Sequence, residues 1–187
     1  MSDYGYAAEG LASGGNGYLR DVEILIAEDN DYARGLLRDI LKVLGANRLH
    51  YCHDGQDALN TARHFDIDIA LVDWHMPIMN GVQFTKTIRM ASDSPNPFLP
   101  IIMISAFAGL EHVAEARDAG INEYLIKPYS ARQLLTRITT VVERPRQFIR
   151  NDGYFGPDRR RIRDRLYTGI EKRKGPVTNG SSATSVA

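Results

Sequence analysis

The chain has 187 residues, of which 43% are hydrophobic, and this is enough for one globular domain of ordinary size with tails. No apolar run approaches the ~18 residues of a membrane-spanning helix, and the N-terminus lacks the basic and apolar regions of a secretion signal. The single cysteine, Cys52, excludes an internal disulfide framework, so we expect a protein of the reducing cytoplasm.

The net charge is zero, but the charges are unevenly distributed along the chain. Residues 144–174 hold eleven basic and four acidic side chains, whereas the rest of the chain holds twelve basic and nineteen acidic ones. This pattern predicts an acidic body with a basic C-terminal arm. Residues 1–20 include five glycines without an apolar period and are expected to be disordered. Residues 145–187 are expected to form a basic, largely irregular extension.

The first half of the body alternates between strand and helix patterns. An apolar run at residues 22–27 predicts a strand, and Asn30 or Asp31 is suited to cap the helix that follows. That helix has apolar residues on one face. A short strand is predicted next at residues 49–52, and then a helix at residues 58–65. The apolar face expected for the first helix consists of Ala33, Leu36, Leu37, Ile40, Leu41 and Leu44.

The second half of the body continues the alternation. Apolar runs at 67–72, 101–104 and 124–126 predict three further strands, and three prolines between residues 92 and 100 predict a loop. Helix patterns follow these strands at residues 82–91, 110–120 and 131–143. The residues expected to face inward from the last two helices are Leu110, Val113, Ala114, Leu134, Leu135, Ile138, Val141 and Val142.

Five alternations of strand and helix predict an α/β fold, with a parallel sheet covered by helices on both faces. The nearly continuous apolar strands fit burial from both sides. No G-x-G-x-x-G follows the first strand and no G-x-x-x-x-G-K is present, which argues against a dinucleotide-binding fold and a P-loop enzyme.

Polar side chains follow four of the five predicted strands at the point where each strand ends. These are the pair Glu28 and Asp29, then Asp73, Ser105 and Lys127. The carboxyl ends of parallel strands lie along one edge of the sheet, so we expect these groups to converge. One aspartate before a turn is usually a turn former, and one surface lysine is usually solvated. The prediction therefore depends on the combination, not on any single residue.

Three carboxylates at one edge would repel one another unless a cation neutralised them. Oxygen ligands without a cysteine or histidine cluster suit Mg²⁺. A lysine and a hydroxyl beside that metal can offset and hydrogen-bond a phosphoryl group. A carboxylate can itself act as a nucleophile and form an aspartyl-phosphate. Asp73 ends the buried run 67–72 and precedes a turn, so we take it as the reacting group.

In this combination the chain resembles the receiver domains of bacterial two-component response regulators. The resemblance covers residues 21–144 and implies a doubly wound, flavodoxin-like sheet of five parallel strands in the order 2-1-3-4-5. The matching segments are residues 27–29, 72–77, 80–81, 105–106 and 124–128.

The resemblance implies that Asp73 accepts a phosphoryl group from a sensor histidine kinase or a phosphotransfer protein. It implies that Mg²⁺ is bound by Asp29 and Asp73 directly, by the backbone carbonyl of His75, and by Glu28 through water. Members of the family hydrolyse their own aspartyl-phosphate, so no enzyme activity on an independent substrate is expected.

The resemblance also implies roles for residues on the last two strands. Lys127 would pair with the phosphate and precede a cis peptide bond to Pro128. Ser105 would act as the switch hydroxyl and Tyr124 as the switch aromatic. A phosphorylation-dependent contact with a downstream protein target would then carry the signal.

Two residues beside the site have alternative interpretations. His75, two positions after Asp73, could reach the phosphate or simply line the pocket. Phe107, two positions after Ser105, could screen the phosphate from water or point outward as part of a partner surface. In the resembling family these positions tune hydrolysis, so we regard both as candidate tuning residues.

The basic arm allows three uses. Arginines interleaved with aromatic residues could bind nucleic acid, they could bind an acidic protein surface such as the body itself, or they could remain a solvated tail. We favour a regulator that signals through protein contacts. A nucleic-acid-binding regulator and a phosphorelay intermediate are the alternatives, and a homodimer remains open.

Overall fold

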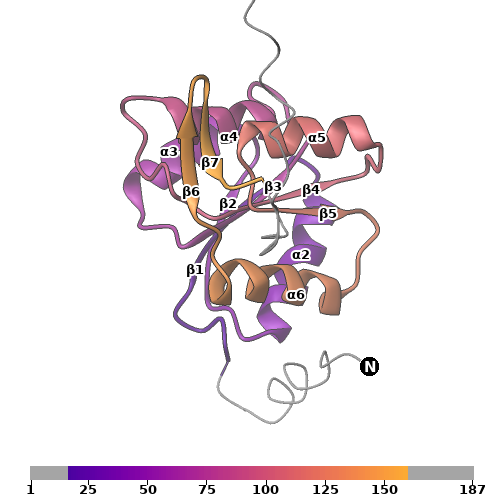
Figure 1. Ribbon diagram of the computed structural model, residues 1–187. Helices are drawn as coiled ribbons and strands as arrows, with labels where there is room; N and C mark the ends of the chain where they lie inside the picture. Colours follow the sequence, from indigo (N-terminus) through magenta and orange to yellow (C-terminus); the bar gives the residue numbers. More distant parts are fainter. Residues whose placement is uncertain (1–16, 160–187) are drawn as a thin grey trace, which may run out of the picture.

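A computed structural model describes residues 17–159 of the protein. Its centre is a sheet of five parallel strands in the order β2-β1-β3-β4-β5 (Figure 1). The doubly wound sheet and strand order expected from the sequence are therefore confirmed. The strands are β1 (Glu23–Ala27), β2 (Arg48–Cys52), β3 (Ile69–Asp73), β4 (Ile101–Ser105) and β5 (Glu123–Ile126).

Helices cover both faces of the sheet because side chains alternate along each strand. Ile24 and Ile26 pack with α2 (Asp31–Val43) and α6 (Ala131–Glu143) on one face. Leu25 and Ala27 pack with the three remaining helices on the other face. Those helices are α3 (Gly55–His64), α4 (Gly81–Met90) and α5 (Leu110–Ala119). Every residue of the central strands β3 and β4 is buried, as sequences apolar on both sides require.

The first predicted helix lies where the sequence places it, but its buried face is narrower than expected. Asn30 caps α2 by accepting from the backbone N–H of Ala33, and Leu37 and Leu41 are buried. Leu36, expected on the inner face, is 51% exposed. Leu110 of α5 and Val142 of α6 are also exposed, so these inward assignments are wrong.

The expected disorder of residues 1–20 is wrong for its last four residues. Residues 17–20 form a turn, and the side chain of Leu19 is completely buried against the α2 and α6 face of the sheet. Residues 1–16 lie outside the described part of the chain.

A second unexpected element follows α6. Strands β6 (Phe148–Asn151) and β7 (Tyr154–Pro157) form an antiparallel hairpin within the segment expected to be irregular. The hairpin lies against α4 and α5 (Figure 1). Its Phe148 and Phe155 pack on Phe98, with ring centroids 5.1 Å apart in each case. The rest of the expected extension, residues 160–187, lies outside the described residues.

Candidate functional site

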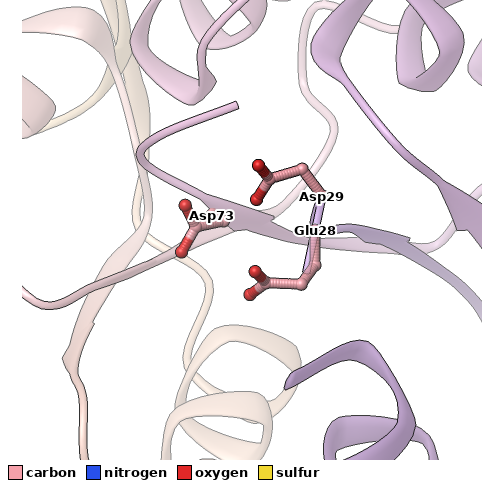
Figure 2. Close-up of side chains that lie close together, drawn as sticks. All are labelled: Glu28, Asp29 and Asp73. Atoms are coloured by element: carbon pink, nitrogen blue, oxygen red, sulfur yellow. The ribbon is translucent and has the colours of Figure 1, made fainter. Parts of the chain in front are cut away.

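The polar strand ends meet at the carboxyl edge of the sheet, as predicted. Glu28 and Asp29 directly follow β1, and Asp73 is the last residue of β3. The pairing of Ala27 with Val72 brings these two strand ends level with each other. Figure 2 shows the three carboxylates extending into the same space, and one oxygen of each lies within 4.8 Å of the others.

Lys127 joins two of these carboxylates. Its Nζ lies 2.5 Å from Asp73 Oδ1 and 2.7 Å from Glu28 Oε2. Burial lowers the pKa of Lys127, but the hydrogen bonds and charges of Asp73 and Glu28 outweigh it and raise this pKa overall. Burial raises the pKa of Glu28, although Lys127 acts in the opposite direction. One cation thus faces three carboxylates, and the site keeps an excess of acidic groups.

The donor set fits Mg²⁺. All three groups supply carboxylate oxygen, which hard divalent cations prefer over nitrogen or sulfur. Glu28 and Asp73 are buried, whereas Asp29 is exposed and leaves one side of the cluster open to water. Mg²⁺ keeps several of its waters in protein sites, so this partly open arrangement suits it.

Asp73 is held in place by the turn that follows it. Its Oδ2 accepts a hydrogen bond from the backbone N–H of His75 at 2.7 Å. The N–H of Gly81 donates to the carbonyl of Trp74 at 3.1 Å, which closes the turn before α4. A Cβ on Gly81 would lie 2.3 Å from the backbone oxygen of Asp73, so the turn requires a glycine there.

Ser105 and Tyr124 are both linked to the backbone of Phe107. The buried Ser105 Oγ accepts from the Phe107 N–H at 3.1 Å. The hydroxyl of Tyr124 donates to the Phe107 carbonyl at 2.8 Å, and the Tyr124 ring is buried. The structure therefore brings the proposed switch residues together through one intervening residue. The cis peptide bond predicted between Lys127 and Pro128 is confirmed.

The two candidate tuning residues lie against each other. The rings of His75 and Phe107 have centroids 5.1 Å apart. The side chain of His75 is exposed, and among the described contacts its ring meets Phe107, not a carboxylate. Phe107 is 37% exposed. It is therefore neither fully buried over the site nor fully turned outward, and it lies at the rim of the site.

Sequence reasoning missed two residues of the site. Arg34 of α2 donates to the backbone carbonyl of Glu28 at 2.7 Å and pairs with Asp31. His112 of α5 stacks on the ring of Phe107. The Arg34 contact was not predictable from helix-end patterns, because the Glu28 carbonyl precedes the N-cap residue Asn30 and is not part of the helix. Nothing local to His112 indicates its aromatic partners, because they come from other elements of the fold.

The chain is similar to known proteins over the residues that form this site. The model of the response regulator receiver domain family matches residues 24–139. The chain is 35% identical over 125 residues to chemotaxis protein CheY-3 of Vibrio cholerae, a match that spans 67% of this chain and 95% of the relative. It is 32% identical to chemotaxis protein CheY of Pseudomonas aeruginosa, over 66% of this chain and 98% of the relative.

Solved structures give the same result. The receiver domain of a Pseudomonas aeruginosa sensor histidine kinase, solved with magnesium coordinated in its active-site cleft, is 30% identical with a TM-score of 0.59. That match covers 65% of this chain and 98% of the other. A Borrelia burgdorferi CheY, solved in complex with CheX, BeF₃ and magnesium, is 25% identical over 65% of this chain and 89% of the other, again with a TM-score of 0.59. With its family match, these relatives and its own carboxylate site, the chain belongs to the response regulator receiver domain family.

Proposed function

We propose that this protein is a phosphoacceptor response regulator in which Asp73 takes a phosphoryl group from a phosphohistidine of a sensor kinase or phosphotransfer protein. The observation that carries the proposal is the pairing of Asp73 with Lys127 inside the three-carboxylate cluster. In the transfer, an Asp73 oxygen forms a bond to phosphorus while the phosphorus–nitrogen bond breaks, and the electron pair stays on the imidazole.

The neighbouring groups stabilise the negative charge that arrives with the phosphoryl group. Lys127 already lies at hydrogen-bond distance from Asp73, so its ammonium can pair with a phosphoryl oxygen bound there. The Ser105 hydroxyl, at the end of the adjacent strand, supplies a further donor. The N–H of His75 keeps the acceptor carboxylate oriented for attack.

Mg²⁺ belongs to the same proposal. Asp29 and Asp73 would bind it directly, with Glu28 acting through water and the His75 backbone carbonyl as a further ligand. The bound ion supplies positive charge that offsets the phosphoryl oxygens. The cluster's own excess of carboxylates supports this assignment, because the single lysine does not balance them.

The signal would leave the site through Ser105, Phe107 and Tyr124. A phosphoryl oxygen offers Ser105 a stronger, charge-assisted partner than any it has in this structure. Because Ser105 and Tyr124 each hold one end of the Phe107 backbone, a shift of Ser105 would be felt at Tyr124. The surface of α5, β5 and α6 around Tyr124 would then change its affinity for a downstream protein target.

The test is covalent labelling of the protein with a phosphoryl donor such as acetyl phosphate in the presence of Mg²⁺. We expect one phosphoryl group on the wild type, none on Asp73→Asn, and none on the wild type in excess chelator. Asp66→Asn, which changes an exposed carboxylate outside the cluster, is the matched control and should label normally. Undiminished labelling of Asp73→Asn would refute the proposal.

A further inference from the structure

Five aromatic rings from four different parts of the chain form one cluster, and two of them belong to Trp74 and His75, the residues that directly follow the phosphoacceptor. Trp74 is in contact with three of the others in edge-on arrangements, with ring centroids 6.4, 5.5 and 6.4 Å away. Edge-to-face contacts at these distances are favourable. The members of this aromatic cluster are Trp74, His75, Phe107, His112 and Tyr124.

His112 makes the one nearly parallel stack of the cluster. Its ring lies 4.5 Å from that of Phe107, with an angle of 8° between the planes, and 5.5 Å from that of Trp74. The buried Nδ1 of His112 has no hydrogen-bond partner among the described residues. Its nearest charged neighbour is Glu111, whose Oε1 is 3.6 Å away. Apart from this contact with Glu111, the described contacts of the His112 ring are with other aromatic rings.

Phe107 lies between His112 and the residues next to Asp73 in the network of ring contacts. The N–H and the carbonyl of Phe107 are hydrogen-bonded to Ser105 and Tyr124, but the residue as a whole is 37% exposed. One neighbour of the Phe107 ring is His75, whose N–H binds Asp73. The ring of Phe107 also contacts His112 and Trp74. Phe107 thus follows the end of β4 by two residues, and its ring contacts one imidazole from the turn after β3 and another from α5.

We propose that His112 is a positioning residue that holds the Phe107 ring at the rim of the Asp73 site and thereby slows hydrolysis of the phosphorylated protein. This inference rests on the proposed function, because it concerns the phosphoryl group on Asp73. In hydrolysis a water oxygen bonds to phosphorus and the bond from phosphorus to the Asp73 oxygen breaks. The aspartate leaves as a carboxylate, and both protons of the water stay with the inorganic phosphate, which leaves as H₂PO₄⁻.

Water must approach phosphorus closely and on the side opposite the leaving oxygen for this step. An apolar ring at the rim removes positions from which water can approach. Because the ring of Phe107 is partly exposed, its outward rotation costs little once the stacked imidazole is absent. The loss of His112 therefore opens the rim without removing any group that binds the phosphoryl oxygens.

The experiment follows the decay of labelled protein after the phosphoryl donor is removed, in Mg²⁺ buffer, with phosphorylated and free forms separated by gel. We expect His112→Ala to label like the wild type but to lose its phosphoryl group about tenfold faster. His112→Phe, which restores a stacking ring without an imidazole, should return the rate to within about twofold of wild type. His64→Ala, an exposed histidine of α3 with no ring contact among the described residues, is the matched control.

The inference would be overturned if His112→Ala lost its phosphoryl group at the wild-type rate, or if His112→Phe lost it as fast as His112→Ala. If the wild type does not accept a phosphoryl group, the proposed function is wrong. The positioning role of His112 can then still be tested by a second measurement. Trp74 is the sole tryptophan, so iodide quenching of its emission reports access to the cluster in the unphosphorylated protein. His112→Ala should increase quenching and His112→Phe should not; unchanged quenching in His112→Ala refutes the positioning role.

Discussion

At the scale of single residues, Asp29 differs from the other two carboxylates of the site because it is exposed and has no ion pair with Lys127 among the described contacts. Removing the charge of Asp29 by substitution should therefore change metal binding while disturbing the buried Glu28 and Asp73 least. Glu28 and Asp73 are held by Lys127, so substitutions there change packing and charge together.

We predict that Mg²⁺ raises the unfolding temperature of the wild type, because an ion that binds only the folded state stabilises it. At a hundredfold excess over the dissociation constant the gain is about 2.7 kcal/mol. Asp29→Asn should lose most of this gain, and chelator should abolish it in the wild type. Differential scanning calorimetry with and without Mg²⁺ measures both effects, with Asp66→Asn as control. A full metal-dependent gain in Asp29→Asn would remove this residue from the ligand set.

The site residues were predictable because each ends an apolar run, and the order of runs and turns in the sequence is enough to place strand ends along one edge. The positions of Asp73, Ser105 and Lys127 at this edge were predicted in this way. His112 was not, because its significance arises from the rings of Phe107 and Trp74, which other elements bring to it. A pattern within one helix contains no information about such partners.

At the scale of elements, spacing predicted where helices lie better than which side chains they bury. Leu36 and Leu37 both fit an apolar helical face, but only Leu37 faces the sheet. The axial rotation of a helix is decided by its packing partner, which local spacing does not contain. For the hairpin, the element itself was not predicted from the sequence. Asp152 and Gly153 form its turn, with Gly153 at a φ of 74°, and an Asp-Gly pair is typical of such turns. The high arginine content of the segment led instead to the prediction of an irregular arm.

The hairpin is attached to the body through the buried Arg89 of α4. Its guanidinium donates to the Gly120 carbonyl and the Pro97 carbonyl, both at 2.9 Å, and to Asn122 Oδ1 at 3.1 Å. It also lies 5.1 Å from the centre of the Phe148 ring. Arg89 therefore joins the ends of α4 and α5, the start of β5 and the hairpin. Its side chain is 2% exposed, so water cannot replace these donors.

We predict that Arg89→Met lowers the free energy of unfolding by roughly 3 kcal/mol, because two buried acceptors and one partly buried acceptor lose a charged donor. Chemical denaturation monitored by circular dichroism measures the change. Lys86→Met, the same substitution of an exposed basic residue one turn earlier on α4, should change stability by less than about 0.5 kcal/mol. An Arg89→Met protein as stable as the control would show that the carbonyls find other partners.

At the scale of the whole molecule, the first part of the basic arm lies on the acidic body. Arg146 donates to the backbone carbonyls of Ile121 and Asn122, and Arg159 pairs with Asp118 at 3.2 Å. Residues 146–159 thus contact the body, through backbone carbonyls and one ion pair, while binding of an acidic surface by the arm as a whole stays a prediction. Nucleic-acid binding by the remaining arm stays a prediction. Among the described residues, no helix has both the length and the apolar character needed to cross a membrane.

The site also affects the stability of the whole fold as a function of pH. Burial raises the pKa of Glu28 in spite of its bond to Lys127, so the folded state holds this proton more tightly than the unfolded chain does. The stability contributed by protonation is present below the unfolded pKa and is lost as the pH rises through the folded one. Lys127, with a raised pKa, stays charged throughout that acidic window. At neutral pH the ionised Glu28 therefore lowers stability relative to a neutral group of the same shape.

We predict that Glu28→Gln raises the unfolding temperature at pH 7 in the absence of Mg²⁺, and that the gain shrinks toward zero near pH 4, where the wild-type carboxyl is protonated. Differential scanning calorimetry over this range, in chelator, measures the difference between the two proteins at each pH. Glu115→Gln, an exposed carboxylate of α5, should show no such pH-dependent gain. A Glu28→Gln protein less stable than wild type at pH 7 would mean that the ion pair with Lys127 outweighs the burial of Glu28. The expected result would instead identify Glu28 as a residue retained for its place beside Asp73 at a cost in stability.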